Sequence, residues 1–178
     1  MTETELKNYI AAIRPADRDA MAAARQRQAQ LAKPPGSLGA LEDMSVRLAG
    51  VTGRVCPPMN RCRVAVFAAD NGVVDEGVSC APRSVTVQQA VNMTRRKTGM
   101  SAMAAAFGDD VAVVDVGMDC GTTPAGILNR RVRRSTGDIA IEDAMTRPQA
   151  LAAIAAGMEQ AALARADGVT ALGIGEMG

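Results

Sequence analysis

The amino-acid sequence predicts an α/β fold, in which a mainly parallel sheet is flanked by helices and preceded by an N-terminal helical segment. Two short, nearly continuous apolar runs, residues 63–69 and 111–116, have the composition of buried parallel strands. A third apolar run, residues 169–172, stands just before the end of the sequence. Segments with helical periodicity separate these runs, and this alternation is typical of a parallel α/β sheet.

The first 53 residues are expected to form the helical segment, which contributes to a small domain. Helices are predicted over residues 3–13 and 17–32, the second with Asp17 as its N-cap. The prolines of the stretch Lys33-Pro34-Pro35-Gly36-Ser37 must end that helix, because proline has no amide hydrogen to donate. Ser37 is then expected to cap a third helix, in which apolar residues recur at helical spacing.

Residues 54–178 are expected to form a partial α/β core domain. Helices are predicted from Ser84 or Thr86 to about residue 96, and over residues 100–107. A longer helix should begin at Thr146-Arg147-Pro148-Gln149, which combines a threonine cap, a proline in the first turn and a glutamine at the capping-box position. Residues 118–145 are expected to be irregular, with one strand near residues 131–133.

The charge balance argues against nucleic acid or membrane as a partner. Twenty lysines and arginines face nineteen acids, so the net charge is +1. No apolar run is long enough to cross a bilayer, and the acidic N-terminus carries no secretion signal, so we expect a soluble, cytoplasmic protein. The one basic cluster is expected to be an ordinary solvated surface, with phosphate contact as the alternative. Its members are Arg130, Arg131, Arg133 and Arg134.

The chain has no histidine, and its four cysteines form no C-x-x-C pair. Ser-His and Cys-His nucleophile chemistry is therefore excluded, and acid–base work falls to carboxylates, lysines or the lone tyrosine. A zinc site would need all four thiolates or carboxylates to converge, so we expect no metal and no cofactor. The cysteines are expected to be reduced and partly buried.

Acids and glycines follow the predicted strands, as in Asp70-Asn71-Gly72 and Asp115-Val116-Gly117. In open α/β sheets, ligands bind outside the carboxyl ends of the strands, so Asp70, Asn71 and Asp115 are candidates to line a pocket. Each has a structural alternative: Asn-Gly favours a tight turn, and either aspartate could cap a turn or helix.

The last six residues, Gly173 to Gly178, read as G-x-G-x-x-G after a strand, which is the dinucleotide-binding pattern. We expect them to form a loop at the site. Glu176 argues against a pyrophosphate there, because two unit charges about 4 Å apart repel by roughly 4 kcal/mol at an effective dielectric of 20. A carboxylate is better suited to sugar hydroxyls or to a protonated ring nitrogen. An ordinary glycine-rich strand exit remains the alternative.

A second polar stretch, Gly77 to Pro82, is followed by Thr86 and Gln88. It offers a hydroxyl, a thiol and an amide near the end of the first strand, a mixture that suits an uncharged, flat, hydrogen-bonding ligand. The alternative is a helix N-terminus capped by Thr86. The chain has two phenylalanines and one tyrosine, so aliphatic and methionine side chains would supply the apolar walls.

Together these stretches resemble the nicotinate-nucleotide–dimethylbenzimidazole phosphoribosyltransferase family. The matches run in order over nearly the whole chain from Lys33 onward. They include Lys33-Pro34-Pro35-Gly36-Ser37-Leu38-Gly39, Ala69-Asp70-Asn71-Gly72-Val73, Gly77-Val78-Ser79, Val85-Thr86-x-Gln88, Val114-Asp115-Val116-Gly117, Ala144-Met145-Thr146 and Gly175-Glu176-Met177-Gly178.

The resemblance implies a Rossmann-like fold with a small helical domain, a homodimer, and transfer of phosphoribose from nicotinate mononucleotide to 5,6-dimethylbenzimidazole in cobalamin lower-ligand synthesis. It places the benzimidazole near four residues, Ser79, Cys80, Ala81 and Gln88. It places the mononucleotide near Glu176 and Gly178. Lys33 and Pro34 are further candidates to line the pocket. The general base in the family is a glutamate far downstream, so no catalytic residue is expected within this chain.

Three departures from the family pattern affect this expectation. The family is about twice as long, so the resemblance implies an N-terminal half that lacks the C-terminal half of the fold and is inactive alone. Asn71 stands where family members usually have histidine, and Ala81 where an aromatic often precedes the proline. Both changes leave base preference open.

Two other functions stay open at this level. The chain could be a non-catalytic module that binds a benzimidazole or a mononucleotide, which would show tight binding without turnover. It could also be a fragment of a NAD-binding oxidoreductase, which would show affinity for NAD.

Overall fold

The computed structural model describes residues 1–178 and divides the chain into two compact units. The larger unit comprises Asn60–Gly178 together with Met1–Glu3, and it contains the whole sheet. The smaller unit, Thr4–Met59, is helical. The assignment of residues 1–53 and 54–178 to separate domains stays a prediction.

The sheet of the larger unit has four strands in the order β3-β2-β1-β4. The strands are β1 (Cys62–Ala69), β2 (Asp110–Gly117), β3 (Leu128–Asn129) and β4 (Ala171–Met177). All three pairings are parallel, so the carboxyl ends of the strands share one edge of the sheet. The predicted α/β fold with a parallel sheet is confirmed.

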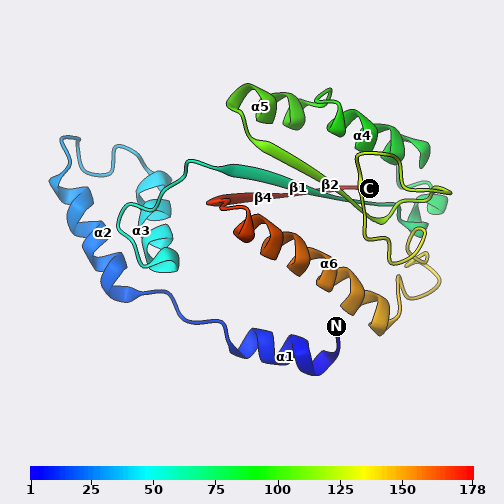
Figure 1. Ribbon diagram of the computed structural model, residues 1–178, viewed down its shortest axis with the longest axis horizontal. Helices are drawn as coiled ribbons and strands as arrows, with labels where there is room; N and C mark the ends of the chain where they lie inside the picture. Colours follow the sequence, from blue (N-terminus) through cyan, green and yellow to red (C-terminus); the bar gives the residue numbers. More distant parts are fainter. The chain divides into compact units, whose positions relative to one another are not determined.

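Helices cover both faces of this sheet. Figure 1 shows α4 (Ser84–Thr94) and α5 (Gly99–Phe107) along one face and α6 (Arg147–Ala166) along the other. The core under α4 joins Ala90 to buried residues of both central strands and the segment after β2. These are Ala68, Val113, Met118 and Ile127. The small alanines let the helix approach the sheet closely, while the valines fill the pleated surface.

The predicted start of α6 is confirmed. The Thr146 side chain accepts a hydrogen bond from the Gln149 amide, and the Gln149 side chain accepts one from the Thr146 amide. This capping box satisfies two of the amide groups that a helix N-terminus leaves without intrahelical partners. The 20-residue helix therefore starts at a fixed point beside the carboxyl edge of the sheet.

The terminal glycine-rich stretch is a strand and not the loop that the sequence predicted. β4 extends through Met177, with Gly173 paired to Val64 and Gly175 to Val66. A Cβ atom at Gly175 would come within 3.3 Å of the Val66 side chain, so the glycine leaves room for that valine. The reason for the difference is pairing: β1 offers unbroken backbone partners as far as Ala68, which outweighs the low strand propensity of glycine.

In the smaller unit, α2 (Arg18–Gln30) packs on α3 (Ala40–Thr52), and α1 (Glu3–Ala11) buries no residue. The core between α2 and α3 consists of Ala20, Ala24, Val46 and Ala49. The predicted N-cap of α2 is confirmed, because the Asp17 carboxylate accepts from the Ala20 amide at 2.9 Å.

The predicted cap of the third helix is wrong. Gly39, not Ser37, occupies the N-cap position of α3, and it makes no side-chain cap. The Glu42 carboxylate accepts from the Leu38 amide at 3.2 Å and so reaches back to the turns before the helix. Consecutive turns from Pro34 carry the chain past Ser37 before the helix can start.

Two further details concern the connections. The strand predicted near residues 131–133 is absent, and the short strand β3 lies at Leu128–Asn129 instead. The Arg131 side chain turns inward to pair with Asp115, while the Arg130 and Val132 amides still donate to carbonyls of β2. The chain therefore passes the end of β2 without forming a regular strand at 131–133. The segment after β1 contains a 3-10 helix, η1 (Gly72–Glu76), within the predicted loop. No helix has the length and apolar character needed to cross a membrane.

Candidate active site at the carboxyl edge of the sheet

A cavity of about 240 Å³ opens where β1 and β4 end and α4 begins. Five segments contribute to it: the end of β1, η1, the loop after η1, the first turn of α4 and the end of β4. The lining residues are Asp70, Asn71, Val73, Val74, Val78, Ser79, Ala81, Pro82, Arg83, Val85, Thr86, Met177 and Gly178. The cavity therefore lies at the edge where parallel α/β sheets bind ligands.

Asp70 stands at the base of this cavity, but its carboxylate is already occupied. One oxygen accepts from the Thr86 hydroxyl at 2.7 Å, and the other accepts from the Asp119 amide at 2.6 Å. The residue is 3 % exposed. Asp70 thus ties the start of α4 to the segment after β2, and it supplies a fixed wall instead of a free base.

Asn71 and Gly72 continue the chain from Asp70, and the Asn-Gly pair does not form the positive-φ turn that was weighed as an alternative. Asn71 is extended, with φ −120° and ψ 133°, and Gly72 is not among the positive-φ glycines. Gly72 is required for a different reason. A Cβ there would lie 2.6 Å from the backbone nitrogen of Asp138 and from the carbonyl carbon of Gly137. The exposed Asn71 lines the cavity beside this close approach.

The loop after η1 brings Ser79 and Ala81 to the cavity. The Ser79 hydroxyl donates to the Ala81 carbonyl at 3.0 Å and accepts from the Ala81 amide at 3.2 Å, which closes a small local turn. Cys80, between them, is exposed and does not line the cavity, and Gln88 is exposed on α4 outside the lining. Ser79 and Ala81 are therefore brought together with Asp70 and Asn71, whereas Cys80 and Gln88 are not.

Thr86 does not cap α4, since the helix begins two residues earlier and its N-cap position is Arg83. Its buried hydroxyl binds Asp70 instead. The remaining lining is largely apolar: Val73, Val74, Val78, Val85 and Met177. A cavity with mostly apolar walls and a few oriented polar groups suits a small, flat, uncharged molecule.

Two residues at the site were not predicted from the sequence: Arg83, which lines the cavity, and Asp119, which bonds to Asp70. Arg83 donates to Asp75 at 2.8 Å and to Asp119 at 3.3 Å, and Arg134 donates to the other Asp119 oxygen. The Arg134 and Arg83 hydrogen bonds hold the pKa of Asp119 below its usual value despite partial burial. No motif marks these residues. The one available signal was an arginine directly before a predicted helix next to the Ser79 loop.

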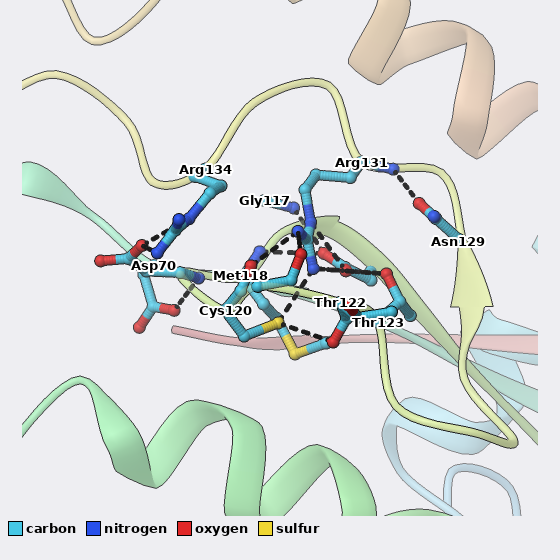
Figure 2. A network of polar contacts seen from close by, with 12 residues as sticks. Asp70, Gly117, Met118, Cys120, Thr122, Thr123, Asn129, Arg131 and Arg134 are labelled. Atoms are coloured by element: carbon cyan, nitrogen blue, oxygen red, sulfur yellow. Dashed lines mark hydrogen bonds and ion pairs between the residues drawn. The ribbon is translucent and has the colours of Figure 1, made fainter.

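Asp115, at the end of β2, belongs to a closed polar network and not to the cavity. It is fully buried, and its oxygens accept from the backbone amides of Gly117 and Met118, the Thr123 hydroxyl and two nitrogens of Arg131. Figure 2 shows the Arg131 side chain pointing into this cluster, where it also contacts Cys120. Burial alone would raise the pKa of Asp115, but the bonds from Arg131 and Thr123 outweigh it and hold the pKa below the usual value.

The arginine cluster is only in part the solvated surface that the sequence predicted. The side chains of Arg130 and Arg134 are 41 % and 59 % exposed, but both pair with carboxylates. Arg131 is 15 % exposed and bonds to Asp115 at 2.7 Å, and Arg134 bonds to Asp119. Arg130 pairs through two nitrogens with Glu159 on α6. The cause is the sequence of the neighbouring segments, which places carboxylates opposite three of the four guanidinium groups.

The remaining candidates are dispersed. Gly178 lines the cavity, whereas Glu176 is exposed on β4, paired to Phe67, outside the lining. Lys33 and Pro34 belong to the smaller unit. Lys33 forms a 2.6 Å ion pair with Glu42, which lowers the pKa of that carboxyl, and it borders a separate cavity of about 340 Å³; Pro34 does not.

The four cysteines are free thiols, two of them exposed. No group of three or more cysteine, aspartate or glutamate side chains could hold a metal ion.

Comparison with known proteins shows the family to which the chain is similar. A sequence model of a protein family described as "Phosphoribosyltransferase" matches residues 13–178. The chain is 42 % identical over 174 residues to the nicotinate-nucleotide–dimethylbenzimidazole phosphoribosyltransferase of Geobacter sp. (strain M21), covering 97 % of this chain and 50 % of that one. The protein of the same name from Yersinia enterocolitica is 43 % identical over 173 residues, with 97 % and 49 % covered.

Among solved structures, the crystal structure of the enzyme from Thermus thermophilus superposes with a TM-score of 0.83 at 44 % sequence identity. The match covers 91 % of this chain and 49 % of the Thermus chain. The chain therefore spans about half the length of the curated relatives and solved structure that it matches.

Proposed function

Because this chain belongs to the nicotinate-nucleotide–dimethylbenzimidazole phosphoribosyltransferase family, we propose that it serves phosphoribosyl transfer in cobalamin lower-ligand synthesis. The substrates are nicotinate mononucleotide and 5,6-dimethylbenzimidazole. The observation that carries the proposal is the cavity at the carboxyl edge, where Ser79, Ala81 and Gly178 meet. The sequence resemblance implies contact with the base for Ser79 and Ala81 and contact with the mononucleotide for Gly178.

In the proposed reaction, a ring nitrogen of the benzimidazole attacks the anomeric carbon of the ribose. The new carbon–nitrogen bond forms as the bond to nicotinate breaks, and nicotinate leaves with the electron pair. The second ring nitrogen gives up its proton to a base. This chain's part is to bind and orient the base. Valine side chains contact the flat ring, and the Ser79 hydroxyl, which lines the cavity, exchanges its bond to the Ala81 carbonyl for one to a ring nitrogen.

We further propose that the proton acceptor is not among the residues that line this cavity. Both Asp70 oxygens are engaged by Thr86 and Asp119, and the chain contains no histidine. A general base contributes about 10²- to 10⁴-fold to such rates, so the 178-residue chain by itself should bind the base but turn over negligibly. Glu176 is proposed to contact the mononucleotide, and Cys80 and Gln88 to border the base. The role of Lys33 and Pro34 as pocket residues stays a prediction from the resemblance.

The same family membership supports the remaining proposals. The chain is proposed to act as a homodimer in the cytoplasm, without nucleic acid or membrane as a partner.

Isothermal calorimetry of the purified chain tests the proposal, with each substrate titrated separately. We expect 5,6-dimethylbenzimidazole to bind one site, and Ser79→Ala to weaken binding about three- to tenfold through loss of one hydrogen bond. Ser84→Ala is the matched control, since Ser84 is exposed on α4 and does not line the cavity. Failure of the wild-type chain to bind the base would contradict the proposal. Product formation at a rate typical of the full-length relatives would contradict the assignment of the proton acceptor.

A further inference from the structure

Arg83 joins three segments around the mouth of the cavity. It occupies the N-cap position of α4, lines the cavity, and is 29 % exposed in its side chain. One terminal nitrogen donates to Asp75 at 2.8 Å and lies 3.4 Å from the Gly72 carbonyl oxygen, so it holds η1. The other donates to Asp119 at 3.3 Å, in the segment after β2. A single guanidinium group thus connects α4 to η1 and to the segment after β2.

The Asp119 end of this bridge is firmly held. Its carboxylate accepts two bonds from Arg134, at 3.0 and 2.8 Å, and its own amide donates to Asp70 at 2.6 Å. Asp119 is therefore fixed through both side chain and backbone, and charge-assisted bonds of this kind are stronger than neutral ones. By contrast, Asp75 is 75 % exposed. Arg83 accordingly connects a fixed point to a surface segment.

The segment that Arg83 holds is short and is anchored mainly at its first residue. The Gly72 amide donates to the Thr136 hydroxyl at 3.1 Å, and Gly72 packs closely on Gly137. Beyond Gly72, the hydrogen bond to another segment is the one that Arg83 donates to Asp75.

η1 spans five residues and has no side-chain cap at its N-terminus. It contributes Val73 and Val74 to the cavity, and Val85 of α4 also lines it. Surface segments with few buried contacts open at low free-energy cost, so the position of these valines depends on cross-links such as the Arg83 bridge.

We propose that Arg83 is a positioning residue of the benzimidazole site, which clamps Gly72–Glu76 against α4 and thereby sets the affinity for the flat base. The inference rests on the proposed function, because it takes the base as the occupant of the cavity. Arg83 acts through the two valines and does not contact reacting atoms. Its loss should leave the fold intact, because the side chains of Arg83, Asp75 and Asp119 are all partly or largely exposed.

Salt dependence separates this role from a simple loss of packing. The base is uncharged at about pH 8, so its own binding has no direct electrostatic component. Raising the ionic strength screens the exposed Arg83–Asp75 pair, since the Debye length falls from about 10 Å at 0.1 M to about 3 Å at 1 M. The dissociation constant of the wild-type chain should therefore rise toward that of Arg83→Ala, while that of the variant changes less.

The test combines calorimetry with amide hydrogen exchange on the 178-residue chain. Arg83→Ala should raise the dissociation constant for 5,6-dimethylbenzimidazole about three- to tenfold, and Arg83→Lys should recover part of it. Exchange of the amides in Gly72–Gly77 should quicken in the same variant. Arg130→Ala is the matched control, because it also breaks a surface ion pair, with Glu159, away from the cavity. Arg130→Ala should change neither the dissociation constant for the base nor the amide exchange over Gly72–Gly77.

Asp75→Asn provides a second variant that breaks the same contact from its exposed side, and it should act in the same direction. The inference is overturned if Arg83→Ala and Asp75→Asn bind the base as the wild type does, or if exchange over Gly72–Gly77 is unchanged. Absence of base binding by the wild-type chain is a different result: it refutes the proposed function, and the role of Arg83 in affinity falls with it.

Discussion

Asp70 directly follows β1, and Asp115 lies near the end of the neighbouring parallel strand β2. Both are buried, yet their surroundings differ. The segment after β2 folds back over Asp115 and fills its surroundings with Arg131 and Thr123. Above Asp70, the chain leaves through η1 and returns at α4, and a cavity remains between them. A buried acid at a strand end is thus weak evidence for ligand contact, because the next segment decides whether space remains.

The largest expected effect is on the free energy of unfolding, through the closed polar network around Asp115. Asp115→Asn removes the charge that Arg131 faces in a buried network, and breaking a buried pair in this way costs about 3 kcal/mol or more. Urea unfolding measures the change. Asp167→Asn is the control, since its pair with Arg63 is half-exposed and should contribute less than about 1 kcal/mol. A loss below about 1 kcal/mol at Asp115 would contradict the account of the closed network.

The next effect concerns the close approach beside the cavity. Gly72→Ala places a Cβ 2.6 Å from the backbone of Gly137 and Asp138, and such overpacking costs about 1–3 kcal/mol. Gly157→Ala is the matched control, because nothing lies within 4 Å of its Cβ position in α6 and alanine favours a helix by about 0.5–1 kcal/mol. Thermal unfolding should therefore shift in opposite directions for the two variants. Equal shifts would show that Gly72 is not sterically required.

A smaller effect is expected at the bond that holds the open side together. Thr86→Val keeps the shape but removes the hydroxyl that donates to Asp70, which should cost about 1–2 kcal/mol of stability. It should also weaken binding of 5,6-dimethylbenzimidazole, whereas Asp115→Asn should not do so in its folded fraction. Denaturant unfolding and calorimetry on the two variants provide both readings. If Asp115→Asn weakened base binding and Thr86→Val did not, the base would bind beside Asp115, which would contradict the account.

The smallest effect is expected from lowering the pH to about 4, which should change the free energy of unfolding little. The pKa values of Asp115 and Asp119 are lowered in the folded chain, so their contribution to stability is present above the unfolded value of about 3.9. It is lost as the pH falls through the folded values. The unfolding free energy of the wild type should thus decline below about pH 4 and that of Asp115→Asn more gently. Parallel curves would contradict the ionised state of Asp115.

The sequence predicted the sheet and most helices, because apolar runs and caps are local signals. Asp17, Thr146 and the two apolar runs at β1 and β2 all carry such signals and were placed correctly. The prediction ended the last strand too early because its glycines are typical of a loop. In the structure, the neighbouring strand β1 pairs with β4 as far as Met177. Tertiary pairing of this kind is not visible in one segment.

For the candidate site, sequence motifs indicated the edge of the sheet where the cavity lies, but not the partners of each side chain. The arginines of residues 130–134 read as a surface because their charge partners, Asp115, Asp119 and Glu159, lie 15 to 29 positions away in sequence. Arg83 carried no motif at all, and its importance comes from three contacts to other segments. Long-range ion pairs have no periodicity, so residue spacing cannot predict them.

The most direct test of the central claim is a titration of the ¹⁵N-labelled chain with 5,6-dimethylbenzimidazole, followed by amide chemical shifts. Binding in the cavity on the Asp70 side predicts large shifts at Ser79, Ala81 and Gly178, and small shifts over Gly117–Thr123, the closed side. Shifts centred on Gly117–Thr123, or none at any amide, would contradict the assignment of this cavity as the base-binding site.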